Sequence, residues 1–68
     1  AAFYYERAAK LDEYRADALV EHARLRVEMQ QYARAAALLR EAQLVEPREN
    51  VAAYLEAVER TARAAEAL

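Results

Sequence analysis

The chain has 68 residues, enough for one small domain but too few to bury a large core. It lacks cysteine and glycine, which excludes disulfide frameworks, thiolate metal sites and glycine-rich phosphate loops. Ten basic and twelve acidic residues give a formal net charge of −2. Their signs are interleaved, which is typical of a solvated helical surface and not of a nucleic-acid-binding patch. No apolar run approaches the roughly 20 residues of a membrane span.

Strong helix formers dominate the composition, and apolar residues do not alternate with the period of a strand. The sequence therefore predicts an all-α fold with four helices. The first is expected at about residues 2–11. Residues 12–15 interrupt the apolar periodicity and are interpreted as a turn. A second helix is expected at about residues 17–29, followed by a short connection at residues 30–32.

A third helix is predicted at about residues 33–45, because alanine and leucine recur there at spacings of three and four. Pro47 should end it, since the residue before a proline is pushed out of the α region. The fourth helix has two candidate starts, either Pro47 in the first turn or Asn50 as the N-cap. It should continue to the end of the chain.

Residues 1–12 and 35–46 are two versions of one segment, separated by 34 positions. Small residues coincide at Ala8 and Ala42, and large apolar pairs coincide as well. We expect Ala8, Ala23 and Ala42 to be nearly fully buried at helix crossings, where small residues allow close approach. A fixed period of about 34 residues is typical of stacked helix–turn–helix units. Stacks of this kind form extended surfaces that bind other proteins.

Residues 16–49 carry a pattern of large and small residues that resembles a complete tetratricopeptide repeat. The matching positions are Leu19, Ala23, Tyr32, Ala35, Leu39, Ala42 and the closing Pro47. The resemblance implies a right-handed α-solenoid of antiparallel helix pairs. In it, residues 1–15 form the second helix of a preceding repeat, and residues 50–68 form a terminal or capping helix.

Three positions of this segment depart from the family pattern. His22 stands where the family favours leucine, and Arg26 where it favours tyrosine. Gln30 stands where it favours glycine, at the tight turn between the two helices.

The resemblance also implies a function, namely a non-catalytic scaffold that binds a protein or peptide segment. In tetratricopeptide proteins the first helix of each repeat lines a concave groove. Here that groove would carry two stripes from the second and fourth predicted helices: Val20, Arg24, Val27, Val51, Tyr54 and Val58. The family's carboxylate clamp uses lysine and asparagine at this face, so recognition of a C-terminal carboxylate by that clamp is not expected.

The residues give little support for catalysis or for a cofactor. His22 is the only histidine, and it has no second histidine or cysteine to share a metal ion. There is no serine, and the single threonine, Thr61, lies on a polar helix. We therefore expect no enzyme activity, no cofactor and no metal, and we interpret His22 as structural or partly exposed.

A second hypothesis is a structural role, in which the chain self-associates as a helical bundle or coiled coil. Phe3, Tyr4 and Tyr5 of the first helix would lack a covering partner, so a second copy or an upstream helix is expected to cover them. The chain begins with alanine, which we interpret as a piece or processed form of a longer protein. The composition is typical of GC-rich bacteria. The sequence does not distinguish a cytoplasmic from a periplasmic location.

Overall fold

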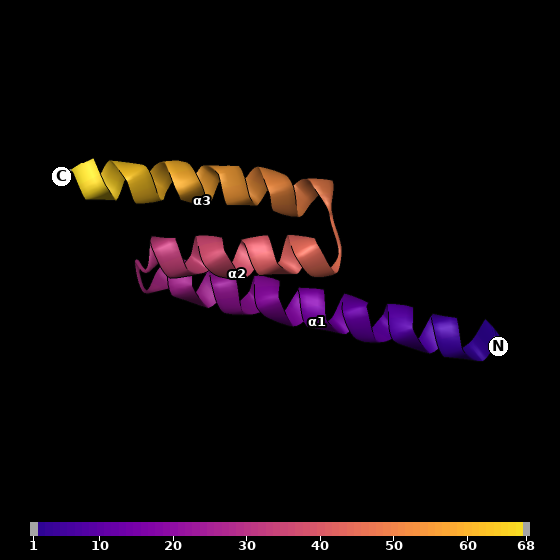
Figure 1. The fold of residues 1–68 in the computed structure, drawn as a ribbon. Coiled ribbons are helices and arrows are strands. Elements are labelled where there is room, and N and C mark those ends of the chain that lie inside the picture. Colours follow the sequence, from indigo (N-terminus) through magenta and orange to yellow (C-terminus); the bar gives the residue numbers. More distant parts are fainter. Residues whose placement is uncertain (1, 68) are drawn as a thin grey trace.

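The computed structural model describes the backbone of residues 2–67 and the side chains of residues 10–67. Within that range it is all-helical, with α1 at Ala2–Glu28, α2 at Tyr32–Val45 and α3 at Glu49–Ala67. Successive helices are antiparallel, and α2 packs against both α1 and α3 (Figure 1). The all-α prediction is confirmed, but the predicted count of four helices is wrong for this range.

The difference arises at residues 12–15, which are helical and not a turn. The segment contains neither glycine nor proline, so nothing in it breaks a helix. All four of its side chains are exposed. Apolar periodicity fails there because α1 leaves the core at this point, and a helix without a buried face needs no apolar stripe.

α1 and α2 form an antiparallel hairpin, and these two helices differ greatly in length. α1 has 27 residues and α2 has 14. Along the described side chains of α1, the first buried residue is Ala16, and residues 10–15 are all exposed. The N-terminal part of α1 therefore extends beyond the end of α2, as the indigo end of the ribbon shows (Figure 1). The principal extents of the chain, 54 × 19 × 13 Å, reflect this overhang.

The core is narrow and built largely from small residues. Its buried cluster comprises Ala23, Ala35, Ala36, Leu39, Val51 and Val58. Leu39 is the largest fully buried side chain among the described residues. Small side chains let helix backbones approach closely, so the predicted burial of Ala23 and Ala42 is confirmed at 0% and 1% exposed. The same expectation for Ala8 lies outside the described side chains.

The α1–α2 turn is closed by a non-glycine residue in the left-handed region. Gln30 has φ 62°, and its N–H donates to the carbonyl of Val27 at 2.9 Å. The N–H of Gln31 donates to the carbonyl of Arg26 at 2.8 Å. Together these bonds form a Schellman motif, which satisfies two carbonyls at the end of α1. The tight turn therefore forms with glutamine in the left-handed region, where glutamine has a steric cost and glycine has none.

The α2–α3 connection depends on Gln43. Its amide accepts from the Arg48 N–H at 2.9 Å and donates to the Arg48 carbonyl at 3.1 Å. Glu46, which precedes Pro47, is extended at φ −150° and ψ 103°, so the prediction that Pro47 ends α2 is confirmed. The Arg48 carbonyl also accepts from the Ala52 N–H, so Arg48 is the N-cap of α3. Both predicted starts, Pro47 in the first turn and Asn50 as the N-cap, are therefore wrong.

Overpacking a helix crossing should destabilise the fold. Ala42→Leu and Ala23→Leu each add a branched side chain where no space exists, and we expect a loss of about 1–3 kcal/mol in the free energy of unfolding. Ala64→Leu is the matched control, because Ala64 is exposed on α3. Thermal and urea unfolding measure the effect. Equal stability of all three variants would contradict the packing described here.

Glycine at the turn should stabilise the chain. Gln30→Gly removes the left-handed penalty of about 1–2 kcal/mol and adds a chain-entropy cost of about 0.5–1 kcal/mol. We expect a net gain of roughly 0.5–1 kcal/mol from these two values, measured as a higher urea midpoint. Gln31→Gly, one position later at φ −94°, should destabilise. A destabilised Gln30→Gly variant would argue against the left-handed turn.

Candidate interaction surface

Five of the six predicted groove residues belong to the core cluster or pack against it, and the sixth, Arg24, does not. Val51 and Val58 of α3 are each 4% exposed and belong to the core cluster. Val20, Val27 and Tyr54 are half-buried and pack against that cluster. A partner can therefore contact the edges of these three side chains, whereas Val51 and Val58 support the surface from beneath.

Arg24 is the one charged residue of the six, and it is exposed. Its Nη1 lies 3.6 Å from Oε1 of Glu21, and the two side chains are 65% and 74% exposed. An ion pair this exposed contributes about 0–1 kcal/mol, so it holds the guanidinium only weakly. Arg24 therefore remains available to a carboxylate supplied by a partner.

Among the described residues, Arg48 makes the shortest side-chain hydrogen bond between segments far apart in the sequence. Its Nη1 donates to Oδ1 of Asp17 on α1 at 2.6 Å, and its Nη2 donates to Oε2 of Glu46 at 3.1 Å. The hydrogen bond to Asp17, followed by that to Glu46, raises the pKa of Arg48. The guanidinium thus ties the middle of α1 to the α2–α3 connection.

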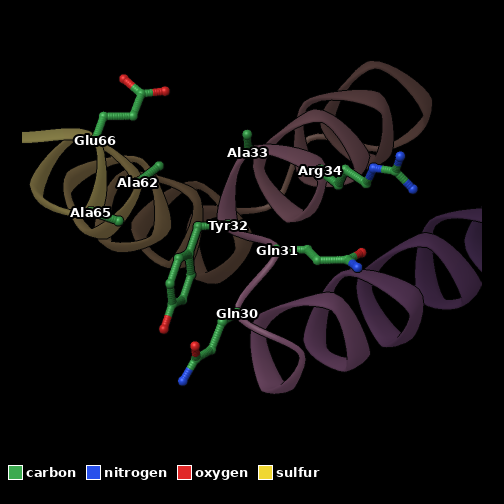
Figure 2. Close-up of a pocket in the computed structure, with 8 residues that line it drawn as sticks. All are labelled: Gln30, Gln31, Tyr32, Ala33, Arg34, Ala62, Ala65 and Glu66. Carbon is green, nitrogen blue, oxygen red and sulfur yellow. The ribbon is translucent and has the colours of Figure 1, made fainter. Parts of the chain in front are cut away.

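An open notch of about 450 Å³ lies where the α1–α2 turn meets the C-terminal part of α3. Figure 2 shows the Tyr32 ring lying beside α3 near Ala65, with the Gln30 side chain close to its hydroxyl end. Glu66 extends on the other side of α3 (Figure 2). The notch is open, with amide, phenol and guanidinium groups on the wall that the turn and α2 form, and two alanines and Glu66 on the α3 wall.

His22 is exposed and makes one contact within its own helix. Its Nε2 accepts from Nε of Arg26 at 3.3 Å, so the contact requires an unprotonated nitrogen. Arg26 is held further by a hydrogen bond from its Nη1 to Oε1 of Gln31 at 2.7 Å. Within the part of the chain that the structure describes, no group of three or more acidic, histidine or cysteine residues is placed to hold a metal ion.

Comparison of the chain with protein-family models, with curated proteins and with solved structures gave no match. None of the helices in the described range is long and apolar enough to cross a lipid bilayer.

The Asp17–Arg48 pair should contribute more to stability than the Arg40–Glu59 pair between α2 and α3. The latter is longer, at 3.7 Å, and its arginine is 57% exposed against 24% for Arg48. We expect Arg48→Ala to lower the melting temperature more than Arg40→Ala. A double-mutant cycle should also show stronger coupling for Asp17 with Arg48 than for Arg40 with Glu59. Equal coupling energies would contradict this ranking.

Proposed function

We propose that the chain is a non-catalytic protein-interaction module of tetratricopeptide type, with a partner segment bound at the surface of Val20, Arg24, Val27 and Tyr54. The hairpin of residues 16–45 supports the proposal, because the small residues at the family's crossing positions are at most 1% exposed. These are Ala23, Ala35 and Ala42. The left-handed Gln30 at the glycine position of the pattern supports it as well.

The chemistry of the proposed partner follows from the accessible residues. Val20, Val27 and Tyr54 present apolar edges, and Arg24 presents a cation that its own helix neutralises only weakly. Arginine and tyrosine are enriched among residues that dominate binding energy. The surface suits an extended or helical peptide with apolar anchors and one acidic group.

A structural role is the second candidate, and the overhang of α1 favours it. Leu11 and Tyr14 are 63% and 72% exposed on a helix that continues beyond α2. An exposed apolar stripe of this kind is typical of a helix that pairs with another chain. The homo-oligomer would then form through the N-terminal part of α1. The part of that expectation concerning Phe3, Tyr4 and Tyr5 lies outside the described side chains.

The binding proposal is tested by reversing one charge. Peptides selected from a random library against the wild-type chain serve as probes for calorimetric titration. Arg24→Glu should weaken their binding by about 1–3 kcal/mol, because a charge-assisted contact becomes repulsive. Arg63→Glu, at an exposed position of α3, is the matched control and should leave binding unchanged.

Melting curves accompany the titration, because a surface charge reversal should change stability by only a few tenths of a kcal/mol. Unaltered affinity in Arg24→Glu would place the binding surface elsewhere.

Sedimentation over a concentration series separates the two candidate functions. A dimer that dissociates on Tyr14→Glu would support the structural role.

A further inference from the structure

We propose that the chain has a second, cationic docking site on the outer side of the α1–α2 hairpin, which binds an acidic amphipathic helix of another protein. The site is a slot of about 240 Å³ lined by His22, Arg26, Arg34, Ala37 and Leu38. It is distinct from the surface of Val20, Arg24, Val27 and Tyr54. The two proposals therefore stand or fall separately.

The slot has the size and the lining of a side-chain pocket. Its wall atoms are almost all apolar, because Ala37, Leu38 and the aliphatic stems of the arginines form them. Its volume is below the roughly 300–1,000 Å³ of pockets that hold small molecules. One aliphatic or aromatic side chain of a partner fits this space better than a whole ligand.

Two exposed apolar side chains of α1 neighbour slot residues by their helical spacing. Leu25 and Met29 are 53% and 52% exposed, and each lies three positions from a slot residue, His22 and Arg26 respectively. Residues three or four apart are neighbours on a helix surface. Exposed apolar groups beside an apolar slot form a continuous contact area, which is the arrangement that receives the apolar face of a helix.

The charge of the slot selects the partner. Arg26 and Arg34 both line it, and no acidic residue does. Within residues 10–67, no carboxylate lies within ion-pairing distance of either guanidinium. Arg26 is fixed by hydrogen bonds to Gln31 and His22, neither of which is an anion. The slot is therefore a local cationic site on a chain whose net charge is −2.

This charge distribution disfavours a second copy as the occupant. A symmetric dimer through this face would bring Arg26 and Arg34 of both copies together, because a two-fold interface uses the same patch on each subunit. Like charges placed together across an interface suppress association. An acidic helix instead supplies the carboxylates that both arginines lack. We therefore assign the site to a helix with one apolar anchor and acidic residues about one turn to either side.

The probe is a designed helical peptide of about 16 residues, long enough for about four turns. It carries a leucine as the anchor for the slot, a second leucine four positions away to face Leu25 and Met29, flanking glutamates and a fluorescent label. Two matched peptides complete the set: one has lysine in place of each glutamate, and the other has alanine in place of each leucine. Fluorescence anisotropy gives the affinity, and ¹⁵N–¹H NMR spectra of the labelled chain locate the contact.

We expect the acidic leucine peptide to bind at least about tenfold more tightly than either matched peptide. Amide shifts should cluster at His22, Arg26, Arg34 and Leu38. Arg34→Glu should weaken binding by at least about tenfold. Its exposed position in the first turn of α2 tolerates an acidic side chain, so folding should be unaffected. Ala37→Glu, also exposed, should obstruct the slot with the same result.

Two controls separate this site from the rest of the surface. Arg63→Glu and Arg60→Glu, both at exposed positions of α3 outside the two proposed sites, reverse the same charge, and both should leave peptide affinity within about twofold of wild type. Equal binding of the acidic and basic peptides, or unchanged affinity in Arg34→Glu, would overturn the proposal. Dimerisation through the slot residues with no peptide binding would overturn it as well.

Discussion

The structure depends on the close contact of α2 with the helices on both of its sides. Ala35, Ala36 and Ala42 are nearly fully buried along α2, and Leu39 fills the space between them. A 14-residue helix is marginal in water on its own, so its stability comes from this packing. With so few large side chains in the core, the contact area depends on how closely the backbones approach. This is why the alanines, and not the exposed leucines, determine the fold.

Much of α2 could be predicted from the sequence because its pattern is periodic and ends at Pro47. The burial of Ala23 followed from its position in the repeat pattern, whereas the tight turn at Gln30 formed despite a departure from that pattern. The continuity of α1 was missed because apolar periodicity was taken as the mark of a helix, whereas residues 12–15 are helical and exposed. Helix propensity alone, with no glycine or proline present, would have given the correct result.

The candidate sites were predicted less completely, for a different physical reason. The bond between Arg48 and Asp17 joins residues 31 positions apart, and no local spacing encodes such a contact. The burial of Val51 and Val58 depends on the rotation of α3 against α2, which their spacing of seven residues does not specify. The cationic slot combines residues from two helices, so it becomes visible only when the hairpin is assembled.

The central claim is that α2 holds the fold together and that residues 10–15 of α1 lie outside the core. Hydrogen exchange of individual amides, measured by NMR on the 68-residue chain, tests it most directly. The account predicts the slowest exchange at residues 35–42 of α2 and slow exchange at residues 20–27 of α1. Exchange at residues 10–15 should be much faster, because only local helix opening protects these amides. Uniform protection along α1, or protection at residues 10–15 equal to that of α2, would contradict the account.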